Sequence, residues 1–162
     1  MAQDVLERMT DQAADVLENG ERFLGAQPLT IKGRNALKVW ASEADVMSAL
    51  PNYVRQHGDI DGIDVADAAI PNAFLAAVTD KRVFVFSRSI TGKPKELIET
   101  HELAATTLDV VDTGDKARSR LFVFGTLSGK VFVGECGING KALESADAFV
   151  QGWIEAEGLS QN

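Results

Sequence analysis

Two amphipathic helices are predicted, one at each end of the chain. Near the N-terminus, apolar residues spaced by three and four over residues 5–17 share one helical face, and Asn19-Gly20 supplies a stop signal. Near the C-terminus, a broad apolar stripe is formed by Leu143, Ala146, Phe149, Val150, Trp153 and Ile154. Acidic and amide side chains, Glu144, Asp147, Gln151 and Glu155, occupy the opposite face. The first helix either packs on its own domain or serves oligomerisation, and the last is expected to cover a sheet.

Short apolar segments between these helices predict that sheet. A strand is expected over residues 22–31, with Pro28 at an edge or a bend, and six more follow in the stretch 73–136. Most are separated by short turn signals such as "TGKPK", "TGDKA" and "SG", which leave no room for crossover helices, so the sheet is antiparallel. The strands "RVFVFSRS" and "RLFVFGTL" are apolar on both faces. Their outer face therefore needs a cover, which we expect from the last helix.

Residues 33–70 depart from this pattern and form an insertion after the first strand. A short helix is expected from Ser42 and a further turn of helix over residues 51–57, followed by an acidic loop over 58–73. The predicted fold class is α+β. About seven antiparallel strands form a partly open barrel capped by a C-terminal helix, with an N-terminal helix and a helical insertion.

Composition and charge narrow the class of protein. A chain of 162 residues is the size of one ordinary domain, and its formal net charge of −8 opposes nonspecific binding to nucleic acid or anionic lipid. The single cysteine, Cys136, permits no internal disulfide. The start "MAQDVLERMTDQ" lacks the basic and apolar regions of a secretory signal, so a cytoplasmic location is expected.

The segment "KVFVGECGINGKALESADAFV" has the strand, glycine loop and helix order of a phosphate-binding loop. In that motif four residues separate the first glycine from Gly-Lys, which is followed by Ser or Thr as a magnesium ligand. Here five residues separate Gly134 from Gly140, and Ala142 follows Lys141. We therefore interpret the segment as the end of a strand and the start of a helix, with Asn139 as a helix cap.

The sequence also offers few residues that could bind a metal ion or act in catalysis. His57, His101 and Cys136 are too few for a closed zinc site, and the acidic segment "DIDGIDVAD" places its glycine at the fourth position rather than the sixth of a calcium loop. His101 and Glu102 lie next to each other in a predicted strand, so their side chains point to opposite faces. A packed thiol is preferred for Cys136 over a reactive thiolate. We expect no metal, no cofactor, no catalytic residue and no enzymatic activity.

One family resemblance is carried by two hairpins and the last helix. "FLAAVTDKRVFVFSRS", with its Thr79-Asp80-Lys81-Arg82 turn, resembles the T-D-x-R strand pair of bacterial pleckstrin-homology-like (PH-like) domains. "SRLFVFGTLSGKVFVGE" and "KALESADAFVQGWI" are similar to that family's last two strands and capping helix. The resemblance implies a partly open barrel and generally no enzymatic activity. It divides the chain into an N-terminal helix (1–20), a single PH-like domain (21–158, insertion 33–70) and a tail (159–162).

Two functions remain open. The first is a noncatalytic interaction module that presents an open barrel end or a strand edge to a protein or peptide. The alternative is binding of an anionic ligand or phospholipid surface by basic loops that share one barrel end: Lys32, Arg34, Arg88, Lys93, Lys95, Lys116, Arg118 and Arg120. We prefer the first because the acidic insertion and the net charge oppose the second. A homo-oligomer fits both functions, and no nucleic-acid partner is expected.

Overall fold

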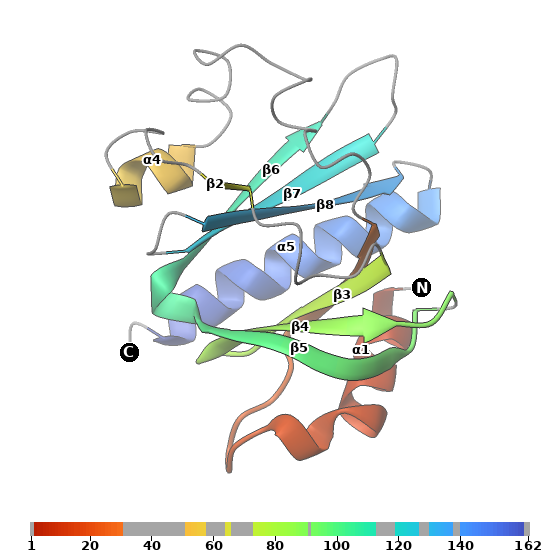
Figure 1. Ribbon diagram of the computed structural model, residues 1–162. Helices are drawn as coiled ribbons and strands as arrows, with labels where there is room; N and C mark the ends of the chain where they lie inside the picture. Colours follow the sequence, from red (N-terminus) through yellow and green to blue (C-terminus); the bar gives the residue numbers. More distant parts are fainter. Residues whose placement is uncertain are drawn as a thin grey trace.

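The computed structural model describes residues 2–30, 51–57, 64–65, 73–90, 92–112, 119–126, 130–137 and 140–160 (Figure 1). The helices are α1 (Ala2–Gln12), α4 (Pro51–His57) and α5 (Gly140–Ser160), with 3₁₀ turns η1 (Ala14–Val16) and η2 (Leu103–Ala105). The strands are β1 (Gly25–Thr30), β2 (Asp64–Val65), β3 (Ala73–Val78), β4 (Arg82–Arg88), β5 (Pro94–Glu102), β6 (Thr106–Asp112), β7 (Ser119–Thr126) and β8 (Lys130–Gly137). The helix expected from Ser42 and the cap expected at Asn139 lie outside the described residues.

Seven of the strands form one open antiparallel sheet in the order β5-β4-β3-β1-β8-β7-β6, as the turn signals predicted. In the β3-β4 hairpin Val78 pairs with Val83, which confirms the tight turn at Asp80-Lys81. Pro28 lies opposite Leu75 of β3, in a stretch of β1 that has one described strand partner. Proline is tolerated at such a position because its missing N–H need not bond a second strand.

Helix α5 packs against the inner face of the sheet. Side chains from the β3-β4-β5 half and from the β6-β7-β8 half of the sheet meet this helix in one core. Its Phe149 ring lies 5.6 Å from that of Phe122, and its Trp153 ring lies 5.9 Å from that of Phe124. Val83, from the other half of the sheet, is fully buried in the same cluster. Figure 1 shows α5 running between β3-β4-β5 and β6-β7-β8. The expectation that the last helix covers the sheet is therefore confirmed for this face.

The outer face of the β1-β3-β4 half is covered by α1. Met9 of α1 is completely buried in a cluster with Phe84 and Phe86 of β4. Strand β4 is apolar on both faces because successive side chains alternate between α5, which covers Val83 and Val85, and α1 on the opposite side. The expectation that the last helix covers the outer face was wrong. The first helix does pack on its own domain.

A buried ion pair fixes the segment after α1 to the β3-β4 turn. The guanidinium of Arg82 donates from Nε to Glu21 Oε2 at 3.1 Å and from Nη2 to Glu21 Oε1. Thr79 Oγ1 donates to the same carboxylate at 2.6 Å, and Arg82 Nη2 also donates to the Val16 carbonyl at 3.0 Å. Burial disfavours the charged form, but the hydrogen bonds from Arg82 and Thr79 outweigh it and lower the pKa of Glu21 to about 2. Two members of the T-D-x-R motif thus anchor the N-terminal segment.

Two departures from the sequence prediction concern local structure. The first helix ends at Gln12 and continues as η1, so the residues predicted as one helix over 5–17 form two pieces. Within the stretch expected to be an acidic loop, β2 pairs in parallel with the start of β8, Asp64 opposite Lys130. A strand of two residues is too short to show a periodic pattern in the sequence. Helix α4 does form over the predicted range 51–57.

Candidate functional site

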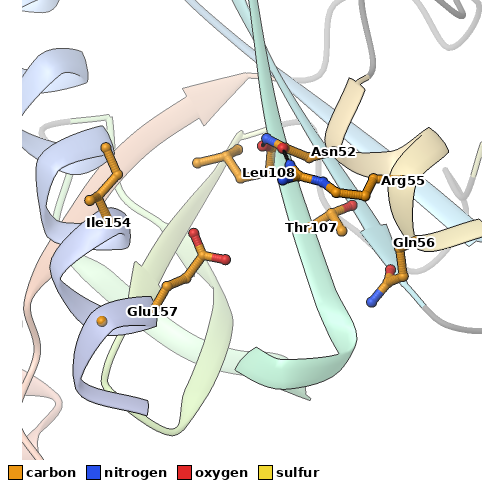
Figure 2. A pocket seen from close by; sticks show the side chains of 8 residues that line it. Asn52, Arg55, Gln56, Thr107, Leu108, Ile154 and Glu157 are labelled. Carbon is orange, nitrogen blue, oxygen red and sulfur yellow. Dashed lines mark hydrogen bonds between the residues drawn. The ribbon is translucent and has the colours of Figure 1, made fainter. Parts of the chain in front are cut away.

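A groove lies along β6, with α4 on one side and α5 on the other (Figure 2). It consists of two adjoining cavities of about 510 and 300 Å³, and both include Asn52, Leu108, Ile154 and Glu157 in their lining. Strand β6 is the last in the sheet order and, among the described strands, pairs with β7 alone. Phe124 of β7 faces Trp153 of α5, whereas a Cβ built at the neighbouring Gly125 would meet Tyr53 of α4, so the two helices pack on opposite faces of the sheet. The edge of β6 with which no other described strand pairs therefore lies between them.

The α4 wall is fixed to β6 by a buried carboxylate. Asp109 is 3% exposed and accepts hydrogen bonds from the main-chain N–H groups of Asn52 at 2.9 Å and Tyr53 at 3.0 Å. Burial raises the pKa of Asp109, although these two hydrogen bonds act in the opposite direction. Asn52 also donates from its side-chain Nδ2 to the Leu108 carbonyl at 2.8 Å. One main-chain acceptor of β6 is therefore bound by a side chain from outside the sheet.

The α5 wall combines an apolar surface with one carboxylate. Trp153 is 3% exposed and belongs to the core, whereas Ile154 is 56% exposed and faces the groove. The sequence pattern placed Ile154 in the buried stripe, and this was wrong because Ile154 lies at the margin of that stripe and lines the groove together with Leu108. Figure 2 shows the Glu157 side chain reaching from α5 toward Leu108. The groove thus offers an exposed apolar side chain beside a charged group.

The surroundings of Glu157 affect its ionisation. Although the side chain is in contact with solvent, the adjacent protein partly desolvates the carboxylate and raises its pKa. The positive charge of Arg55 and a hydrogen bond from the Trp153 side chain partly oppose that effect. Arg55 itself donates from Nη2 to the Asn52 side-chain oxygen, which holds its guanidinium on α4.

The basic residues predicted as an alternative ligand site are described in part. Lys32, Arg34, Lys116 and Arg118 lie outside the described residues, whereas Arg88, Lys93, Lys95 and Arg120 are described. The strand ends that carry Arg88 and Arg120 lie at the same end of the sheet, since Thr30 pairs with both Ala73 and Glu135. Of the insertion, the described parts contact β6 and the start of β8, away from that end.

Arg88 uses its guanidinium to join three strand ends. Its Nε donates to the Leu29 and Phe74 carbonyls at 3.2 and 2.9 Å. Its Nη2 donates to the Leu29 carbonyl and to Thr30 Oγ1, and its Nη1 donates to the Ser89 carbonyl. Burial lowers the pKa of Arg88. With these contacts the side chain holds the ends of β1, β3 and β4 together.

The other three described basic residues differ in their surroundings. Arg120 is largely buried and donates from Nη1 to Asp147 of α5 at 2.8 Å. Lys93 and Lys95 are exposed in the β4-β5 hairpin, close in sequence to Ile90, which is 99% exposed. The two lysines are therefore the described members of the set whose side chains extend into solvent.

The glycine-lysine segment forms a strand followed by a helix, as interpreted from the sequence. Gly134 lies inside β8 rather than in a loop, and α5 begins at Gly140. A Cβ at position 134 would lie 2.6 Å from Phe74 Cζ and 2.8 Å from Leu29 Cβ. Close packing inside the sheet accounts for this glycine without a phosphate ligand.

The remaining candidates for chemistry are dispersed. His101 lies in β5 with its ring stacked on Phe132 at 5.7 Å, and its Nε2 is 3.6 Å from Glu99. Cys136 lies in β8, partly exposed, opposite Arg120. Within the described ranges, no three side chains of His, Cys, Asp or Glu gather closely enough to hold a metal ion.

Comparison with known protein families and with curated proteins finds no match to the chain. Among the helices that the structure describes, none combines the length and apolar character needed to cross a membrane.

The groove was missed by the sequence analysis. The sequence assigned no role to Asn52 or Glu157, since each lies on a helix with no motif around it. Ile154 carried the one available signal, an apolar residue at the margin of a helical stripe. That signal becomes informative only when the position of α4 is known.

Proposed function

We propose that this chain is a noncatalytic PH-like interaction module that binds an extended segment of a protein partner in the groove along β6. The observation that carries the proposal is the edge of β6 with which no other described strand pairs, and which lies between α4 and α5 beside cavities of about 510 and 300 Å³. An extended peptide can add to such an edge through main-chain hydrogen bonds, while its alternate side chains enter flanking pockets.

The binding mode is consistent with contacts that already exist at this edge. Asn52 supplies a side-chain N–H to the Leu108 carbonyl at 2.8 Å, in the way that a peptide N–H would. Main-chain groups of a strand alternate in direction, so Leu108 and Val110 would present their N–H and C=O groups to the same side. A bound segment would continue the pattern that Asn52 begins.

The PH-like assignment rests on the order of elements. Seven antiparallel strands in the order β5-β4-β3-β1-β8-β7-β6, followed by α5 on their inner face, fit the partly open, helix-capped barrel that the resemblance implies. In this assignment the T-D-x-R hairpin is β3-β4 and the capping helix is α5. The 3₁₀ turn η2 separates β5 from β6, so in this assignment β6 is the first strand of the second half of the barrel, β6-β7-β8.

Selection from a random-peptide display library against the full chain tests the proposal. We expect peptides whose affinity falls about tenfold or more for the variant Ile154→Arg, because the new charge would occupy the apolar part of the groove. Leu97→Arg is the matched control, since Leu97 is also an exposed apolar residue, 41% exposed, on the opposite edge strand β5. Thermal unfolding of both variants checks that each is folded.

Backbone methylation of a selected peptide tests strand addition itself. Only alternate residues of an added strand direct their N–H groups toward β6. N-methylation at one set of alternate positions should therefore abolish binding, while methylation at the other set should be tolerated. Equal effects of the two sets, or equal binding to the wild type and Ile154→Arg, would contradict the proposal.

A further inference from the structure

Three side chains whose oxygen atoms can accept hydrogen bonds, those of Gln56, Thr107 and Glu157, line the groove beside its apolar surface. Gln56 Oε1 and Thr107 Oγ1 are buried atoms for which the described chain supplies no hydrogen-bond partner. Both residues line the larger cavity, together with Glu157. Buried acceptors without partners are rare in folded proteins, because each loses its hydrogen bonds to water. The Gln56 oxygen can only accept and the Thr107 hydroxyl can accept or donate, so a group that donates hydrogen bonds can satisfy both atoms, whereas a group that only accepts would leave Gln56 Oε1 without a partner.

The negative charge of Glu157 also favours a ligand that donates hydrogen bonds, in particular a positively charged one. Glu157 lies in the last turn of α5, where the described helix contains no basic residue to offset the partial negative charge of its C-terminal end. Arg55 is the basic residue in the lining of the larger cavity, and its guanidinium is bound to the Asn52 side chain. Partial desolvation of Glu157 makes an additional positive charge at this point favourable.

We propose that the partner segment carries a lysine or arginine that binds Glu157 and Gln56, next to an apolar residue that contacts Ile154 and Leu108. This inference rests on the proposed function and names the chemistry of the partner. A long basic side chain suits the site because its aliphatic part can lie on Ile154 while its charged end reaches the carboxylate. The formal net charge of −8 favours encounter with a basic segment over an acidic one.

Comparing peptide selections between variants tests this inference. From a random-peptide library, the wild-type chain should select sequences with lysine or arginine at one fixed position. Glu157→Gln should remove that preference and weaken binding of a wild-type-selected peptide about three- to tenfold. Glu157→Lys should instead select aspartate or glutamate at the same position. Such an exchange is not expected if Glu157 only stabilises the fold.

The matched control is Glu155→Gln, on the same helix. Glu155 is exposed and lies 3.9 Å from Arg22, outside the lining of the groove. This variant should keep the wild-type preference. Peptides that depend on Ile154 but show no basic position, or a basic preference that survives Glu157→Gln, would overturn the inference and leave the proposed function standing. A library that yields no binding peptide would contradict the proposed function itself.

Discussion

At the scale of single residues, Glu21 and Arg82 show how a charged pair can fix a terminal segment to the sheet. The Glu21 side chain is completely buried, whereas that of Arg82 keeps 23% of its surface exposed. Arg82 also lies over the Phe84 ring at 4.7 Å, next to the cluster that holds α1. The pair therefore supports the apolar contacts of α1 from the edge of that cluster.

Glu21 should make the fold sensitive to acid. Its pKa is about 2 in the folded protein against 4.5 ordinarily, so its stabilising effect is complete above pH 4.5 and is lost as the pH falls toward 2. The difference corresponds to about 3 kcal/mol of unfolding free energy. Urea unfolding of the wild type and Glu21→Gln at several pH values measures this effect. We expect a stability difference near neutral pH that shrinks toward pH 2.

The control for this comparison is Glu155→Gln, which removes an exposed carboxylate. Its unfolding free energy should follow that of the wild type at every pH. If Glu21→Gln also followed the wild type from neutral pH to pH 2, the Glu21-Arg82 pair would contribute nothing to stability.

For Arg88, the sequence predicted the position in the sheet but not the hydrogen-bond partners. Its place at the end of β4, and hence at the end of the sheet that gathers basic residues, followed from strand order. Its partners did not follow, because the Leu29 carbonyl comes from a strand 59 positions away in the chain. Positions along strands are local information, whereas hydrogen-bond partners across a sheet depend on register and packing.

At the scale of elements, strands were predicted well because their turns are short and carry local signals. The same reasoning could not decide which helix covers which face of β4, since the pattern of Val83 to Phe86 shows only that both faces are buried. It also could not detect β2 or place α4 beside β6. The groove results from that placement, so the candidate site could not be predicted even though both of its helices were.

The contact between α5 and β1 depends on Gly152. A Cβ at this position would lie 2.3 Å from the Leu24 carbonyl oxygen and 3.0 Å from Gly25 Cα. Alanine has a higher helix propensity than glycine by about 1 kcal/mol, but here overpacking should outweigh that gain. We expect Gly152→Ala to lower the unfolding free energy by about 1–3 kcal/mol in urea unfolding.

Gly158 provides the matched control in the same helix. No heavy atom lies within 4 Å of a Cβ built at Gly158, so the substitution meets no steric barrier. Gly158→Ala should leave stability unchanged or raise it by up to about 1 kcal/mol. Equal stability of the two alanine variants would mean that α5 does not approach β1 as closely as described.

At the scale of the whole molecule, the two candidate surfaces occupy different places. The groove lies along β6 between α4 and α5, whereas the β4-β5 hairpin with Lys93 and Lys95 lies at the end of the sheet where β4 finishes. Two described arginines at that end are engaged, Arg88 with main-chain carbonyls and Arg120 with Asp147. A peptide groove and a charged hairpin can therefore be tested independently.

Anionic vesicles provide that independent test of the hairpin. A basic residue near an anionic surface contributes about 1 kcal/mol, so Lys93 and Lys95 would add about 2 kcal/mol, against the formal net charge of −8. We therefore expect little co-sedimentation of the full chain with phosphatidylserine-containing vesicles at ~0.15 M salt. The variant Lys93→Glu with Lys95→Glu, and the control Lys81→Glu at the other end of β4, should behave alike. Strong, salt-sensitive binding that only the hairpin variant abolishes would instead make lipid recognition the leading function.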